Sequence, residues 1–185
     1  MSLRFLPNAI CVLRILLVAP LVAAIVDGRY TIALALIVIA GLSDGLDGFL
    51  AKRFDWRTRL GGLLDPAADK LLLVSTFVAL AYVGVMPRGV VAIVVGRDMV
   101  IVAGAICYHL LIAPVQGEPA AISKLNTACQ LAFGVFMLTF AAFGWPSPSL
   151  LLLLGAAVVF TSLVSGLNYV LRWGTRAWRV AHQTA

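Results

Sequence analysis

The sequence predicts an all-α integral membrane protein whose single domain, residues 1–185, is a bundle of six transmembrane helices. Of its 185 residues, 62% are hydrophobic and 12% are charged, and the mean hydropathy is +1.04. A soluble domain of this length could not bury so much apolar surface, so the composition indicates the membrane class. At about 20 residues for each span, the apolar sequence suffices for six spans.

Six apolar runs are separated by turns that contain glycine, proline or charged residues, as helix ends require. The turns cover residues 27–29, 53–60, 86–89, 114–119 and 144–149. The predicted spans are therefore about 8–26, 31–53, 61–84, 89–112, 122–143 and 149–171. The first run is similar to a secretory signal peptide, but Ala23 and Ala24 form a poor cleavage site and more spans follow. We expect this run to be retained as the first helix.

The basic residues predict the orientation of the bundle. With the N-terminus inside, most lysines and arginines lie on the inner side, and the outer loops carry only Arg29 and Arg88. By the positive-inside rule, both termini then face the cytoplasm. The formal net charge of +6 indicates contact with an anionic membrane surface and not with nucleic acid, and we expect the Arg- and Trp-rich segment 172–179 to be an interfacial anchor. No Arg-rich, Ser-rich transit segment precedes the first span, which predicts a bacterial inner membrane.

Four of the eight acidic residues stand at fixed spacing on two neighbouring apolar runs: Asp44, Asp47, Asp65 and Asp69. We call these four residues the acidic motif. A charge inside the hydrocarbon layer is costly, so acidic residues there usually serve function. The first two are three residues apart and the last two are four apart, so on helices each pair shares one face. Four carboxylates that met without compensation would repel one another, which predicts a positive charge between them.

The chemistry of these ligands predicts the compensating charge. Hard oxygen ligands favour Mg²⁺ or Mn²⁺. Two such ions, bridged by carboxylates and a substrate phosphate, stabilise the attacking and leaving oxygens of a phosphoryl-type displacement. Gly48 and Gly61 remove side chains where a nucleotide or diphosphate must approach the backbone closely. The acidic motif therefore predicts a metal-dependent diphosphate site on the cytoplasmic side.

The complete pattern around the acidic motif is more specific than its carboxylates alone. It reads D-G-L-D-G-F-L-A-K from Asp44 to Lys52, then eight residues, then G-x-x-x-D-x-x-x-D. This spacing resembles the signature of the CDP-alcohol phosphatidyltransferases, D-x-x-D-G-x-x-A-R-x8-G-x-x-x-D-x-x-x-D. The sequence departs from that signature only at Lys52, where the family carries arginine. Arginine grips phosphate with two donors whereas lysine acts as a point charge, so the change bears on donor affinity, and the adjacent Arg53 is a candidate substitute.

The resemblance implies that a CDP-linked donor binds at this site and loses CMP to an acceptor hydroxyl. It implies that Asp44, Asp47 and Asp65 ligate metal, and that Asp69 removes the proton of the acceptor and helps to hold the second ion. The residues that it places against the donor are Gly48, Ala51, Lys52, Arg53 and Gly61. It also implies a homodimer. Because no plausible covalent nucleophile stands beside the acidic motif, we expect single-step in-line transfer.

Three further polar features lie outside the acidic motif. They are Asn8 and Arg14 in the first span, Arg97-Asp98 in the fourth, and Ser123-Lys124-x-Asn126-Thr127-x-x-Gln130 in the fifth. They resemble the cardiolipin synthases more than the phosphatidylglycerophosphate synthases, which typically carry Arg-Glu and Lys-x-Lys-Thr in the last two places. The acceptor contacts predicted in this way are Asn8, Arg14, Arg97, Lys124 and Asn126. A structural pair of Arg97 with Asp98 and a snorkelling role for Lys124 are the alternatives, and the sixth span is ordinary apolar sequence.

Asn126 favours one acceptor, because it stands where the phosphatidylglycerophosphate synthases carry a second lysine. Dianionic glycerol 3-phosphate would favour an extra cation, whereas the monoanionic phosphodiester of phosphatidylglycerol needs less positive charge. The sequence therefore predicts phosphatidyl transfer from CDP-diacylglycerol to the anionic phospholipid phosphatidylglycerol, which yields cardiolipin and CMP. Transfer to glycerol 3-phosphate is the alternative.

Two other classes of protein also place carboxylates in membrane helices. An intramembrane prenyltransferase uses Asp-rich helices and Mg²⁺, but it normally has more spans and a second Asp motif much farther along the chain. A divalent-cation channel or transporter lines a pore with rings of Asp. The channel hypothesis leaves Gly48, Gly61 and the spacing of the acidic motif unexplained.

Overall fold

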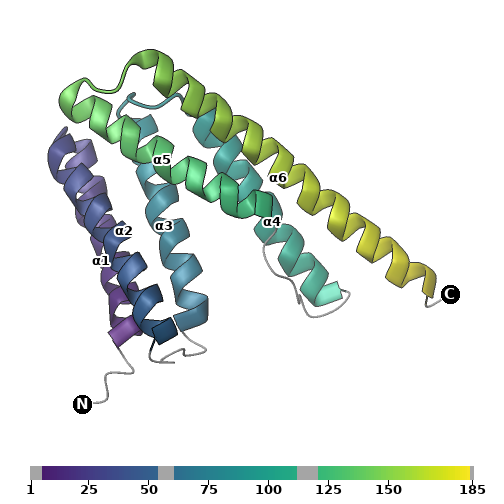
Figure 1. Cartoon of the computed structure of the whole chain (residues 1–185). Coiled ribbons are helices and arrows are strands. Elements are labelled where there is room, and N and C mark those ends of the chain that lie inside the picture. The colour runs from purple at the N-terminus through teal and green to yellow at the C-terminus, as the bar shows by residue number, and fades with distance from the viewer. Residues whose placement is uncertain (1–5, 54–60, 112–120, 184–185) are drawn as a thin grey trace. The chain divides into compact units, whose positions relative to one another are not determined.

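The computed structural model describes the backbone of residues 6–53, 61–111 and 121–183, and within these ranges the side chains of residues 9–43, 67–105, 122–171 and 175. This part of the chain contains helices and no strand. The helices (Figure 1) are α1 (Leu6–Val26), α2 (Tyr30–Arg53), α3 (Gly61–Tyr82), α4 (Arg88–Leu111), α5 (Ala121–Phe143) and α6 (Pro148–Gln183). The predicted all-α fold class is confirmed.

The observed helices begin and end within two residues of the predicted spans, except at the end of α6. That helix has 36 residues, which at 1.5 Å per residue is about 54 Å, and it continues past the predicted end at residue 171. Three helical segments of the described chain are long and apolar enough to cross a membrane, namely Ala9–Val26, Ile122–Phe143 and Pro148–Leu171, and Tyr30–Ser43 is a shorter apolar helix. The protein is therefore an integral membrane protein, while the spans assigned to α2, α3 and α4 stay a prediction.

The chain forms two compact units. The first comprises Met1–Met86 with Gly134–Ser147, and the second comprises Pro87–Phe133 with Pro148–Ala185. The first unit thus holds α1, α2, α3 and the second half of α5, and the second holds α4, the first half of α5 and α6. That the chain works as one domain stays a prediction.

In the first unit, α1 packs against both α2 and α3 (Figure 1). One stripe of α1 is buried, namely Cys11, Arg14, Leu21, Ala24 and Ile25. These intervals of three, four and seven residues keep side chains on one face of a helix. Helix α2 contributes the buried stripe of Ala33, Ile37 and Ala40, in which the small alanines allow helices to approach closely.

A tight turn sets the direction of the helices in the first unit. Gly28 follows α1 with a φ of 72°, a conformation that favours glycine at the end of a helix. The backbone N–H of Arg29 donates to the carbonyl of Ala24 at 2.8 Å, which closes the turn. Helix α2 therefore runs back along α1, and the start of α1, the end of α2 and the start of α3 lie at the same end of this unit (Figure 1).

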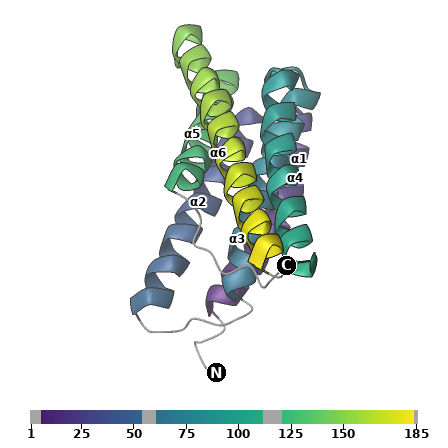
Figure 2. The same ribbon diagram turned by 90° about the vertical axis from the view of Figure 1, so that its right-hand side faces the viewer.

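In the second unit, α4 and α6 pack side by side, as both Figure 1 and Figure 2 show. Helix α5 approaches α6 at Gly155, where an added Cβ would lie 3.3 Å from Cζ of Phe133. Gly155 therefore leaves room for the Phe133 ring, which is 2% exposed. Close packing of this kind stabilises helices in a membrane, where lipid is as apolar as the side chains.

Candidate active site

The acidic motif lies on helix ends that share one end of the first unit. Asp44 and Asp47 are in the last three turns of α2, and Asp65 and Asp69 are in the first three turns of α3. At 1.5 Å per residue, the four positions lie about 6 to 14 Å along their helices from those ends. The backbone thus places all four in one layer. Of the predicted site residues, these have side chains outside the described part of the structure: Asn8, Asp44, Asp47, Gly48, Ala51, Lys52, Arg53, Gly61 and Asp65.

The Asp69 carboxylate is joined to α1 by an ion pair. The Arg14 guanidinium donates through Nη1 to Oδ1 of Asp69. Each of the two residues stands eight positions after the start of its helix, about 12 Å along it, and both helices start at the same end. The Arg14 side chain is 1% exposed and that of Asp69 is 46% exposed. The structure therefore places the buried Arg14, a predicted acceptor contact, against Asp69, the predicted general base.

Arg97, another predicted acceptor contact, joins three helices of the second unit. Its Nη1 donates to Oδ1 of Asp98 at 2.8 Å, and its Nη2 donates to Oγ of Ser123 at 2.9 Å and to Oγ of Ser165. The Arg97 and Asp98 side chains are 8% and 10% exposed. An added Cβ on Gly166 would lie 3.4 Å from Cγ of Arg97, so α6 passes close to the arginine stem. This is the structural pair with Asp98 that the sequence allowed as the alternative.

Asn126 is fully buried in the second unit and accepts two hydrogen bonds. Its Oδ1 lies 2.9 Å from Oγ1 of Thr161 and 2.9 Å from Oγ of Ser162, and both hydroxyls donate to it. These contacts fix the side-chain amide of α5 against α6. Lys124, two residues earlier on α5, is exposed. The predicted acceptor residues of α5 thus divide into a buried amide and an exposed cation.

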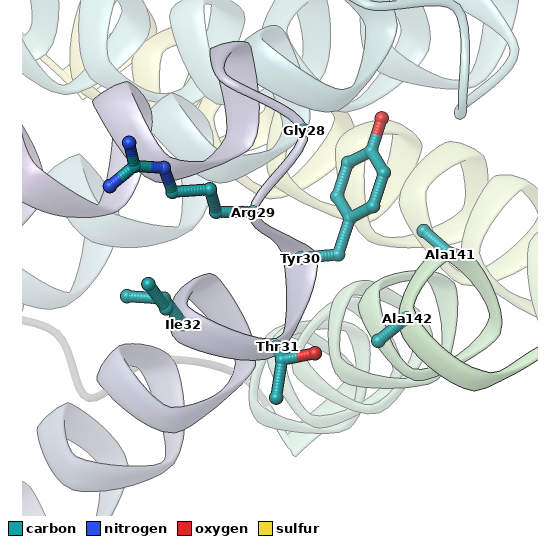
Figure 3. A pocket seen from close by; sticks show the side chains of 7 residues that line it. All are labelled: Gly28, Arg29, Tyr30, Thr31, Ile32, Ala141 and Ala142. Atoms are coloured by element: carbon teal, nitrogen blue, oxygen red, sulfur yellow. The ribbon is translucent and has the colours of Figure 1, made fainter.

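A cavity of about 310 Å³ in the first unit lies away from the acidic motif. It is lined by residues 28–32, at the turn between α1 and α2, and by Ala141 and Ala142 of α5. Figure 3 shows that the Arg29 and Tyr30 side chains point away from each other there. Because this turn joins the opposite ends of α1 and α2, the cavity is not part of the candidate active site.

The statistical model of one protein family, described as CDP-alcohol phosphatidyltransferase, matches residues 4–170. The chain belongs to the CDP-alcohol phosphatidyltransferase family. The matched range includes the whole acidic motif and the polar residues of α4 and α5. The family resemblance seen in the sequence is confirmed.

Curated relatives of two kinds are similar to this family member. A human cardiolipin synthase (CMP-forming) is 31% identical over 180 residues, which cover 89% of this chain and 60% of the relative. A chloroplastic CDP-diacylglycerol–glycerol-3-phosphate 3-phosphatidyltransferase of rice is 28% identical over 186 residues, covering 91% of this chain and 56% of the relative. A probable phosphatidylglycerophosphate synthase of Mycobacterium tuberculosis is 27% identical, with 90% and 80% covered. The chain spans about three fifths of the length of the human relative.

Members of this family generally use divalent metal ions, and the residues present fit such an ion. The acidic motif offers only carboxylate oxygens, the ligands that Mg²⁺ and Mn²⁺ prefer. The one motif carboxylate whose side chain is described, that of Asp69, already has a cation against it. It also remains about half exposed, so an ion and a substrate can reach it from the open side.

The hydroxyl groups of α6 that hold these polar side chains were not predicted from the sequence. Thr161, Ser162 and Ser165 are buried and donate to Asn126 or accept from Arg97. Their only signal in the sequence is a spacing of one and three residues within an apolar span. That spacing places Ser162 and Ser165 on one side of a helix.

Replacing Asn126 with Leu is expected to lower the free energy of unfolding by about 1–3 kcal/mol, because buried hydroxyls lose their acceptor. Ser162 should account for most of the loss, since the single hydroxyl proton of Thr161 can go to the Ala157 carbonyl at 2.8 Å instead. Denaturant unfolding in detergent, followed by circular dichroism, measures the change. Thr127→Ala is the matched control on α5, because Thr127 is exposed and its hydroxyl bonds only within its own helix in the described contacts. Equal destabilisation by both variants would contradict the buried role.

Proposed function

We propose that the protein is a membrane phosphatidyltransferase that transfers the phosphatidyl group of CDP-diacylglycerol to phosphatidylglycerol, giving cardiolipin and CMP. The observation that carries this proposal is the family match over residues 4–170, which contains the acidic motif with its family spacing. The cardiolipin synthase relative is 31% identical to the chain, which supports the choice of acceptor. The name of another relative includes glycerol 3-phosphate, so that acceptor is the second candidate.

In the proposed reaction, a hydroxyl oxygen of the acceptor attacks the phosphorus that carries the diacylglycerol. A new phosphorus–oxygen bond forms there, and the bond from that phosphorus to the oxygen bridging to CMP breaks, so that CMP leaves with the electron pair. Asp69 accepts the proton of the attacking hydroxyl. A general base must reach the proton that it takes, and the half-exposed carboxylate of Asp69 is accessible in this way.

The acidic motif and the residues beside it have proposed parts in binding. Asp44, Asp47, Asp65 and Asp69 would hold two Mg²⁺ or Mn²⁺ ions, which would neutralise charge on the diphosphate and on the leaving group. The backbone at Gly48 and Gly61, beside Ala51, admits the donor closely. Lys52 and Arg53 supply positive charge to the donor diphosphate.

The acceptor contacts are proposed residue by residue, as the resemblance implies them. We propose Asn8 and Lys124 as contacts of the acceptor headgroup, in which a cation meets the single phosphodiester charge. The ion pair of Arg97 and the buried hydrogen bonds of Asn126 favour structural roles for those two residues. The basic residues support an orientation in which both termini and the acidic motif face the cytoplasm, as in a bacterial inner membrane. The resemblance implies a homodimer, and we propose that the working form of this protein is a homodimer.

A two-acceptor assay tests the proposal. Purified protein receives CDP-diacylglycerol and Mg²⁺, with phosphatidylglycerol and glycerol 3-phosphate supplied separately; CMP release is followed and the lipid products are identified by mass. We expect CMP and cardiolipin with phosphatidylglycerol, and only background with glycerol 3-phosphate or without acceptor. Phosphatidylglycerophosphate as the product would shift the proposal to the second candidate. Cation flux into liposomes without CMP release would instead support a channel or transporter.

A further inference from the structure

We infer that Arg14 is a positioning residue for Asp69: it fixes the orientation of the carboxylate and weakens the hold of Asp69 on the metal ions. This inference rests on the proposed function, in which Asp69 takes a proton from the acceptor. In place of the predicted acceptor contact, it gives Arg14 a role that acts through a neighbouring side chain. The geometry of the pair carries it.

The ion pair is asymmetric in its burial. The Arg14 side chain is 1% exposed, whereas that of Asp69 is 46% exposed. On α1, Arg14 lies in the buried stripe that includes Cys11 and Leu21, each fully buried. A side chain packed in this way cannot follow movements of its partner. The arginine is therefore the fixed member of the pair, and the carboxylate takes its orientation from it.

The contact also distinguishes the two oxygens of Asp69. Nη1 of Arg14 donates to Oδ1, so this oxygen is directed toward the buried stripe of α1. Rotation about the last bond of an Asp side chain is otherwise broad, and a free carboxylate would present either oxygen to the substrate. The contact with Arg14 removes this freedom, because Oδ1 is held at the buried guanidinium.

The charge of Arg14 has a second effect. A general base needs a lone pair directed at the proton, and a carboxylate that chelates a metal ion with both oxygens directs lone pairs at the ion instead. The Arg14 guanidinium at Oδ1 competes with a metal ion for that oxygen, and its positive charge repels the ion. Arg14 thereby keeps Asp69 from acting purely as a ligand. Removal of the Arg14 charge should therefore strengthen metal binding and slow the release of CMP.

The variants Arg14→Gln and Arg14→Lys separate this role from others. Glutamine keeps a hydrogen-bond donor but loses the charge, and lysine keeps the charge but loses the planar geometry. Mn²⁺ binding to the purified protein is measured by electron paramagnetic resonance, and CMP release gives kcat and the acceptor KM. For Arg14→Gln we expect roughly threefold to tenfold tighter Mn²⁺ binding, as for loss of a nearby unit charge, with kcat lowered about tenfold and KM unchanged. Arg14→Lys should restore Mn²⁺ affinity but only part of kcat.

Arg29→Gln is the matched control, because Arg29 is exposed and follows the opposite end of α1; it should leave Mn²⁺ affinity, kcat and KM unchanged. If the pair is purely structural, Arg14→Gln should lower thermal stability and leave Mn²⁺ affinity unchanged. If Arg14 contacts the acceptor, the variant should raise the acceptor KM and leave kcat unchanged. Either result overturns the inference. If Arg14→Gln does not fold, unchanged kcat in Arg14→Lys overturns it. Failure of the proposed function is separate, since wild-type protein would then release no CMP while Mn²⁺ binding could still be compared.

Discussion

Replacing Asp69 with Asn is expected to abolish turnover in practice, with a loss of about 10²–10⁴-fold, the usual contribution of a general base. The amide cannot take the proton of the acceptor hydroxyl. Its oxygen can still accept the hydrogen bond that Arg14 donates to Oδ1, so the contact between α1 and α3 should persist. CMP release measures turnover, and Mg²⁺-dependent binding of CDP-diacylglycerol, measured separately, should remain largely present.

Asp27→Asn is the control for this variant. Asp27 is an exposed carboxylate that follows the opposite end of α1, and its loss should change neither turnover nor donor binding. A loss of donor binding in Asp69→Asn as large as that in Asp44→Asn would show that Asp69 serves principally as a metal ligand. The proton would then have to go to another group.

Asp44→Asn should have a comparably large effect, but on a different quantity. We expect loss of Mg²⁺-dependent donor binding, because a neutral amide oxygen replaces one of the charged ligands that the ions prefer. Turnover at moderate Mg²⁺ should fall with binding, and the Mg²⁺ concentration for half-maximal rate should rise at least about tenfold, since a ligand contributes on the order of 1.4 kcal/mol or more.

Titrating the Mg²⁺ concentration distinguishes the two Asp variants. High Mg²⁺ should restore part of the activity of Asp44→Asn, whereas it should not restore that of Asp69→Asn. If Asp44→Asn binds Mn²⁺ and the donor as the unmodified protein does, the assignment of Asp44 as a metal ligand is wrong. Asp27→Asn serves again as the control for a change of charge alone.

The helices of this protein could be predicted closely because their signals are local. Apolar runs and turn residues such as Gly28 mark helix ends in the sequence itself. The end of α6 was missed because hydropathy defines where the apolar layer ends, while backbone hydrogen bonds decide where a helix ends. The helix continues to Gln183 through basic residues, which are good helix formers.

The acidic motif could be predicted because its residues are close in sequence and have a recognisable spacing. The pairing of Arg14 with Asp69 could not be predicted, because the two residues are 55 positions apart. Whether they lie at the same height along α1 and α3 depends on the turn lengths and on how the helices pack. The hydroxyl of Thr161 also bonds to its own helix, as Ser and Thr hydroxyls in helices commonly do. The sequence therefore could not distinguish it from any other threonine of an apolar span.

The same ion pair affects how the chain is made. An arginine near the middle of a transmembrane helix costs about 2.5–3.5 kcal/mol on the scale of insertion from the translocon, and Arg14 occupies such a place in α1. Its counter-charge on α3 is synthesised 55 residues later. A nascent chain that has delivered only α1 and α2 to the bilayer thus lacks this compensation, and we expect biogenesis of the N-terminal half to reach a stable intermediate only when α3 inserts.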